Sequence, residues 1–153
     1  MAGKEDGAAT PQWVDALVQV SFAVQDALSR AAADHDLSVT QLRLLGVLRD
    51  RMPAMAVLAH HLGLDPSSVS GLIDRAERRG LVLRSTSPAD ARVTIVSVTP
   101  AGREISNRLA RAVTVQLEEL VGQASSAKRD FIVQLAESVV EIRNVPRSAE
   151  EMA

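Results

Sequence analysis

Apolar residues recur every three or four positions along most of this chain, a spacing that predicts helices with one packed face. One such stripe runs through 13–31, and two later ones occupy 105–120 and 131–142. The pattern changes at 81–84 and 93–98, where aliphatic and β-branched residues predict two strands. We therefore expect a mainly helical protein whose middle carries one β-hairpin.

Three short helices are predicted before the hairpin. Ser38 and Gln41 form a capping box that opens the first, and Gly63 ends the second. Asp65 and Pro66 open the third, because an N-cap carboxylate accepts free backbone N–H groups and proline suits the first helical position. This order of three core helices and a hairpin is the winged helix-turn-helix, which places one helix in a DNA major groove.

The outward face of the third helix is small, hydroxylated and basic. It carries Ser67, Ser68, Ser70, Gly71, Asp74, Arg75, Arg78 and Arg79. Hydroxyl groups can bind phosphates or base edges, and small residues allow a close approach to DNA. The same composition also occurs on helix faces that only contact water, so the hairpin that follows is what favours the DNA-binding interpretation.

The central segment resembles the MarR family of bacterial winged-helix regulators. The matching elements are Leu62-Gly63-Leu64, Val69-Ser70, Asp74-Arg75, Glu77, Gly80-Leu81-Val82, Arg84, Asp90-Ala91-Arg92 and Thr99-Pro100-Ala101-Gly102. Two positions depart from the family pattern. Ala76 stands where the family often has Leu, and Ala91 replaces an Arg of the wing, which removes one potential phosphate or groove contact.

The resemblance implies one MarR-like domain over 1–153, with a DNA-binding lobe at 38–99 and dimerisation helices at 11–34 and 100–144. It implies a dimeric repressor that reads a palindromic operator in double-stranded DNA, with the wing in the minor groove. A monomeric helical bundle is the alternative for the terminal helices. The residues expected to contact DNA are Pro66, Ser67, Ser68, Ser70, Arg75, Arg78, Arg84, Asp90 and Arg92.

The family places an effector crevice between the DNA-binding lobe and the dimerisation helices. The resemblance therefore implies a site for a small aromatic, phenolic or other apolar anion that releases the protein from its operator. The residues expected there are Trp13, Leu17, Val20, His35, Arg43 and Leu45. The alternative is a regulator of the same fold that has no small-molecule ligand.

Charge and composition narrow the function further. The chain of 153 residues has a net charge of −2, yet residues 40–103 hold nine Arg and only five acidic residues. A basic middle segment is typical of a DNA-facing surface. Zero Cys excludes disulfides and cysteine metal sites, and adjacent His60 and His61 diverge on a helix, so no metal site is expected.

No enzyme is expected, because the chain offers no Cys nucleophile and no glycine-rich phosphate loop. No cofactor is expected either. We expect a cytoplasmic protein without membrane contact, because no apolar run approaches the length of a membrane span. A helical interaction protein that does not bind DNA remains the last alternative.

Overall fold

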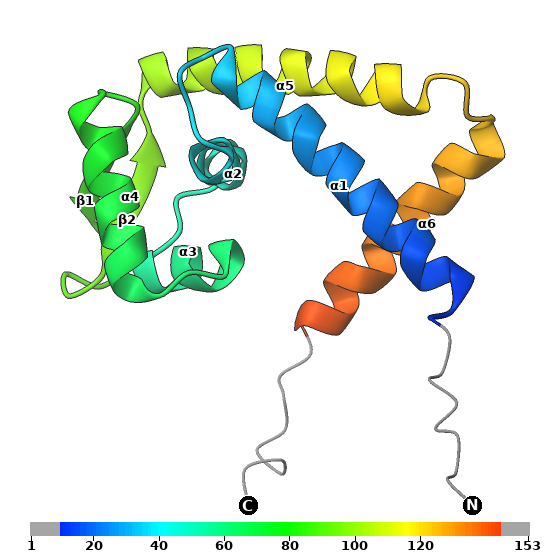
Figure 1. The fold of residues 1–153 in the computed structure, drawn as a ribbon. Helices are drawn as coiled ribbons and strands as arrows, with labels where there is room; N and C mark the ends of the chain where they lie inside the picture. The colour runs from blue at the N-terminus through cyan, green and yellow to red at the C-terminus, as the bar shows by residue number, and fades with distance from the viewer. Residues whose placement is uncertain (1–9, 145–153) are drawn as a thin grey trace, which may run out of the picture. The chain divides into compact units, whose positions relative to one another are not determined.

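A computed structural model of the chain describes residues 10–144 and is drawn in Figure 1. The helices and strands follow in the order α1 (Gln12–Ala33), α2 (Val39–Leu48), α3 (Met55–Leu62), α4 (Pro66–Arg78), β1 (Val82–Thr86), β2 (Thr94–Val98), α5 (Pro100–Val121) and α6 (Ser126–Asn144). The chain divides into two compact units between Leu120 and Val121. The predicted mainly helical fold with one antiparallel hairpin is confirmed.

Local signals set the helix boundaries as the sequence predicts. The Ser38 hydroxyl accepts from the Gln41 N–H at 3.2 Å, and the Gln41 side chain accepts from the Ser38 N–H at 3.0 Å. Gly63 ends α3 with φ of 66°, a left-handed conformation that glycine adopts without strain. Gly80 takes the same conformation with φ of 69° just after α4.

The hairpin is longer than the sequence predicts. Strands β1 and β2 pair from Val82 opposite Val98 to Thr86 opposite Thr94, so β1 extends two residues into the expected loop. The structure also contains a pairing that the sequence does not predict. The Val96 N–H donates to the Pro53 carbonyl at 3.0 Å, and Ala54 forms an antiparallel bridge with Ile95. The segment before α3 thus lies against β2 and ties the hairpin to the helices.

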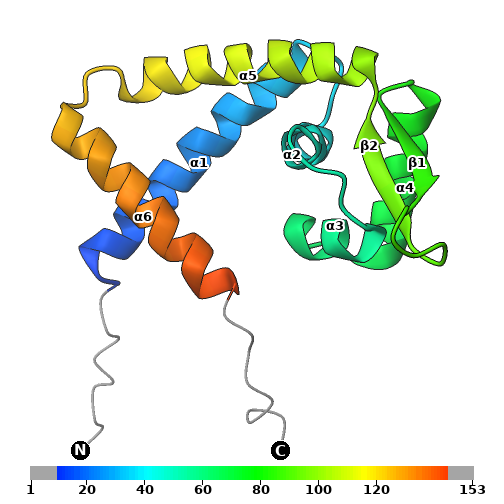
Figure 2. The same cartoon turned by 180° about the vertical axis from the view of Figure 1, so that it is seen from behind.

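One hydrophobic core lies among α2, α3, α4 and the hairpin. Its largest fully buried side chains are Leu44, Leu45, Leu48, Leu58, Leu72, Ile73, Val69, Val82 and Val96. Ala32 from the end of α1 and Leu109 from α5 complete this core. Figures 1 and 2 show the three short helices and the hairpin gathered together beneath one end of α5.

The Thr-x-x-Gly motif holds the start of α5 against the hairpin. The Thr99 hydroxyl donates to the Gly80 carbonyl at 2.6 Å and accepts from the Gly102 N–H at 3.0 Å. A Cβ at position 102 would lie 1.9 Å from the Leu81 carbonyl oxygen, closer than any side chain can approach. Only glycine allows this close contact between α5 and Leu81, the residue just before β1.

The terminal helices leave much apolar surface uncovered. Trp13 of α1 is 69% exposed and Phe131 of α6 is 62% exposed. Every side chain from 126 to 140 is exposed, although α6 carries the apolar stripe predicted from the sequence. Within the part of the chain that the structure describes, no helix combines the length and the apolarity that a bilayer crossing requires.

Candidate nucleic-acid interface

The exposed surface of α4 consists of three rows of side chains, because residues three or four apart share a helix face. Val69, Leu72, Ile73 and Ala76 are buried, so they fix the direction of the core. The outermost row opposite this core consists of Ser67, Gly71, Asp74 and Arg78. Ser68 and Arg75 form the edge toward α2, whereas Ser70 and Glu77 form the edge toward β1.

The N-terminus of α4 is held by a single carboxylate. Asp65 Oδ1 accepts from the Ser67 hydroxyl at 2.5 Å and from the Ser68 N–H at 2.9 Å, and Oδ2 accepts from the Ser68 hydroxyl at 2.6 Å. These donors, the Ser67 hydroxyl first, lower the pKa of Asp65 well below its ordinary value. The predicted N-cap is confirmed, but the sequence did not indicate that both serine hydroxyls would also turn to it.

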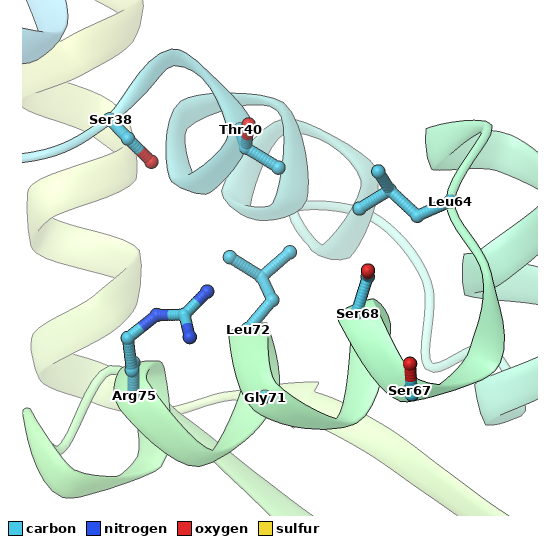
Figure 3. Close-up of a pocket in the computed structure, with 8 residues that line it drawn as sticks. All are labelled: Ser38, Thr40, Leu64, Ser67, Ser68, Gly71, Leu72 and Arg75. Carbon is cyan, nitrogen blue, oxygen red and sulfur yellow. The ribbon is translucent and has the colours of Figure 1, made fainter.

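An open hollow of about 510 Å³ lies between α4 and the start of α2. Figure 3 shows Arg75 and Leu72 pointing from α4 toward Ser38 and Thr40 at the start of α2. Ser67 and Ser68 lie at the other end of the same stretch of α4. Arg75 is exposed, so its guanidinium is available to an acceptor that approaches this surface.

Arg84 of β1 turns toward α4 rather than away from the lobe. Its guanidinium donates to Glu77 at 2.5 Å, to Asp74 at 2.6 Å and to the Ser70 carbonyl at 3.2 Å. Its own N–H donates to Glu77 at 2.9 Å, and this bond is the main cause of the lowered pKa of Glu77. These contacts join the hairpin to α4, and any contact of Arg84 with DNA would compete with them.

The wing loop is braced by Asp90. Its carboxylate accepts from the Arg92 N–H at 2.9 Å, and its carbonyl accepts from the Val93 N–H at 3.0 Å. This turn presents the exposed Arg92 side chain at the end of the hairpin. Pro66, Ser67, Ser68, Arg75 and Arg78 are also exposed, whereas Ser70 is half-buried.

The residues expected to line an effector crevice are not gathered in the single chain. Leu45 is 1% exposed and belongs to the core, whereas Trp13, Leu17 and Val20 are exposed on α1. Arg43 lines a separate hollow of about 390 Å³ with residues of α2, α3 and the loop between them. The His35 carbonyl accepts from Arg79 at 3.5 Å.

That contact is part of a link that the sequence analysis missed. Arg79, at the end of α4, also donates to the Asp36 carbonyl at 2.6 Å. Asp36 has φ of 55°, which is unusual for a residue other than glycine. The turn after α1 is therefore tied to the end of α4. Neither residue belongs to a local motif, so sequence spacing offered no signal for this contact.

Comparison with known proteins finds a family match in the central segment. Residues 35–93 match the MarR family. A transcriptional regulatory protein for the hcr operon of Thauera aromatica is 30% identical over 82 residues, which are 54% of this chain and 49% of that protein. The chain thus spans about half the length of that relative. The homoprotocatechuate degradative operon repressor of Escherichia coli is 27% identical over 131 residues, 84% of this chain and 88% of that protein.

Solved structures share the fold over nearly the whole chain. The crystal structure of CouR from Rhodococcus jostii RHA1, bound to p-coumaroyl-CoA, superposes with a TM-score of 0.76 at 22% identity. The superposition covers 91% of this chain and 96% of that one. At this level of identity the likeness establishes the winged-helix fold with its flanking helices.

Proposed function

We propose that this chain is a dimeric repressor of the MarR family that binds a palindromic operator in duplex DNA, because residues 35–93 match that family and the Escherichia coli repressor is 27% identical over 131 residues. In this proposal α4 enters the major groove and the wing contacts the adjacent minor groove. The operator-binding residues are the exposed serines and arginines of α4 together with Arg92 of the wing.

The observation that carries this proposal is the geometry of one lobe. The hydroxylated and basic surface of α4 lies next to a hairpin that the Arg84 contacts with Asp74 and Glu77 hold against it. The Asp90 turn then presents a free arginine side chain at the end of that hairpin. A reading helix and a wing held in fixed relation can contact two neighbouring grooves at once.

Two copies are proposed because, among the residues that the structure describes, α6 has a large exposed apolar surface. The exposed residues of α6 include Phe131, Ile132, Val133, Leu135, Val139 and Val140. Exposed apolar surface on this scale is typical of protein interfaces. A two-fold dimer would also present two copies of α4 to half-sites about 34–36 Å apart.

The proposed effector is a small aromatic carboxylate or phenol. Two of the similar proteins support this class, since one is named for homoprotocatechuate degradation and the other was solved with p-coumaroyl-CoA. The candidate residues include the exposed apolar side chains of α1, with Arg43 available for a carboxylate. Because these residues are separated in one chain, we place the crevice where a second copy covers α1.

The DNA-binding proposal is tested by titrating the protein into a duplex fragment from upstream of its own gene. We expect Arg92→Ala to weaken binding by about 1–3 kcal/mol and to reduce the salt slope by about one unit. Arg111→Ala, on the exposed surface of α5, is the matched control and should leave both quantities unchanged. Salt-independent binding by the wild type, or an unchanged slope for Arg92→Ala, would contradict the proposal.

The effector proposal is tested by thermal shift and calorimetry with salicylate and 4-hydroxyphenylacetate. A ligand that binds only the folded state raises Tm, and we expect it also to weaken operator binding by about 1–3 kcal/mol. If neither compound binds at millimolar concentration and DNA affinity stays unchanged, the ligand-free alternative is favoured.

A further inference from the structure

The two serines at the start of α4 both donate their hydroxyl protons to Asp65. Ser67 Oγ lies 2.5 Å from Asp65 Oδ1, and Ser68 Oγ lies 2.6 Å from Asp65 Oδ2. The Asp65 carboxylate also accepts the Ser68 N–H at 2.9 Å, so its two oxygens hold three donors. An ionised carboxylate has no proton to donate, and hydrogen bonds to it are among the strong ones.

This arrangement fixes the polarity of both side chains. A hydroxyl has one proton and two lone pairs. Because each proton points to Asp65, the outward part of each serine oxygen can only accept. The lowered pKa of Asp65 is consistent with a carboxylate that stays ionised throughout the physiological range.

Acceptors discriminate among the groups that DNA presents. Phosphate oxygens only accept hydrogen bonds, and so do the O6 and N7 atoms of guanine and the O4 atom of thymine. The N6 amino group of adenine and the N4 amino group of cytosine donate in the major groove. The negative charge of Asp65 further disfavours a phosphate at this end of the helix.

The other end of the α4 surface has the opposite polarity. Arg75 and Arg78 are exposed and carry only donors, which suit guanine or phosphate. They follow Ser67 and Ser68 by two to three turns, about 10–16 Å along the helix axis. The recognition helix therefore presents acceptors at its start and donors toward its end.

We propose that Asp65 is a specificity-determining residue, which makes Ser67 and Ser68 select bases with an amino group, adenine or cytosine, over the keto bases guanine and thymine. Asp65 acts as a positioning residue, because it contacts the serines rather than the base. This inference rests on the proposed function, since it requires α4 to lie in the major groove of duplex DNA.

The experiment is a selection from a randomised duplex library with the full-length protein, followed by binding measurements on the enriched sequences. The base positions that Ser67 and Ser68 contact are identified as those whose preference disappears in the Ser67→Ala, Ser68→Ala double variant. Every base pair carries one amino and one keto base, so the contacted group is identified by removing the amino group. At these positions we expect purine in place of adenine, or 2-pyrimidinone in place of cytosine, to weaken wild-type binding about fivefold or more.

Asp65→Asn is the decisive variant. Its amide oxygen still accepts the Ser68 N–H, so the N-cap is retained while at least one serine proton becomes free to turn outward. We expect the loss of affinity on removing the amino group at the mapped positions to be about fivefold smaller for Asp65→Asn than for the wild type. Binding to nonspecific duplex should strengthen at the same time, because a negative charge has been removed.

Two controls separate the hydroxyl effect from the charge effect. Asp50→Asn removes the same charge at an exposed carboxylate that pairs with Arg49, and it should leave base preference unchanged. Asp65→Asn added to the double-alanine variant should change nonspecific binding without changing base preference. Far-UV circular dichroism and Tm verify that each variant folds.

Three results would overturn the inference. Removal of the amino group at the mapped positions could leave wild-type binding unchanged, or Asp65→Asn could retain the wild-type dependence on that group. The double-alanine variant could instead lower the salt slope and erase no base preference, as expected of phosphate contacts. Failure of the proposed function has a different signature, since the wild type would then enrich no sequence and would not bind duplex in a salt-dependent way.

Discussion

The winged-helix lobe and the last helix have similar apolar periodicity, but the apolar residues are buried in the lobe and exposed in the helix. In the lobe, Val69, Leu72, Ile73 and Ala76 of α4 are all buried. In α6, residues at the same kind of spacing are exposed, and Val139 is 46% accessible. Periodicity thus predicts which face of a helix requires a partner, but it does not say whether that partner lies in the same chain.

The difference has a physical basis in how each element is connected. Helices α2, α3 and α4 are joined by short turns and closed by the hairpin, so their apolar faces meet within one chain. Burying such surface contributes about 25 cal/mol for each Å² removed from water. The apolar stripe of α6 is exposed in one chain, so its burial against a second copy would stabilise a dimer.

The largest expected effect is a loss of stability when Gly102 in the lobe is replaced. We expect Gly102→Ala to lower the free energy of unfolding by about 2–4 kcal/mol, because its Cβ would lie 1.9 Å from the Leu81 carbonyl oxygen. Urea unfolding followed by circular dichroism measures the change. Gly46→Ala is the matched control, since open space surrounds that helical glycine, and it should stabilise the protein by about 0.5–1 kcal/mol. Equal behaviour of the two variants would contradict the close contact.

Charged substitutions on α6 test whether its exposed apolar surface contacts a second copy. We expect Phe131→Glu with Val139→Glu to weaken dimerisation about 10- to 100-fold, because charges are costly in an apolar interface. Light scattering coupled to size exclusion measures the mass against concentration. Leu83→Glu introduces the same charge at a lobe position of similar exposure, 42% against 46%, and should leave the mass unchanged. A wild-type protein that is monomeric at every concentration would remove the argument for a second copy.

A smaller effect is expected where the hairpin meets α4. Arg84→Gln should lower the free energy of unfolding by about 1 kcal/mol, a value discounted for the partly exposed partners Asp74 and Glu77. It should also weaken DNA binding, since the wing would lose its fixed relation to the recognition helix. Arg108→Gln, whose nearest carboxylate oxygen on Glu104 is 3.8 Å away, should change stability by less than about 0.5 kcal/mol. Identical unfolding curves for these two variants would show that the cluster adds no stability.

The smallest expected effect is a pH dependence from Glu77. Its pKa is lowered on folding by the Arg84 N–H and guanidinium, so the associated stability is present above the ordinary value of 4.5 and is lost as the pH falls through the lowered value. We expect wild type to lose more stability than Glu77→Gln between about pH 5 and pH 3. Urea midpoints across this range measure the difference, with Glu104→Gln as the exposed control. Parallel curves for wild type and Glu77→Gln would contradict the prediction.

Local chemistry explains how much of the fold the sequence predicts. The capping box at Ser38, the Asp65 cap and the positive φ of Gly63 each depend on residues within a few positions of one another. The bounds of α2, α3 and α4 could therefore be located from the sequence. The contacts of Pro53 and Ala54 with β2 could not be predicted, because pairing between segments about 40 residues apart does not change the local spacing of residue types.

The candidate site likewise has features that the sequence predicts and features that only the structure shows. Sequence identified the serines and arginines of α4 and the wing arginine as a group, because their types and spacing are typical of a DNA-facing helix. Only the tertiary structure decided that Arg84 turns inward to Glu77 and Asp74, and that Arg79 binds the carbonyl of Asp36. The direction of a long side chain depends on which acceptors the folded chain brings within reach, and acceptors distant in sequence are fixed only when the elements pack.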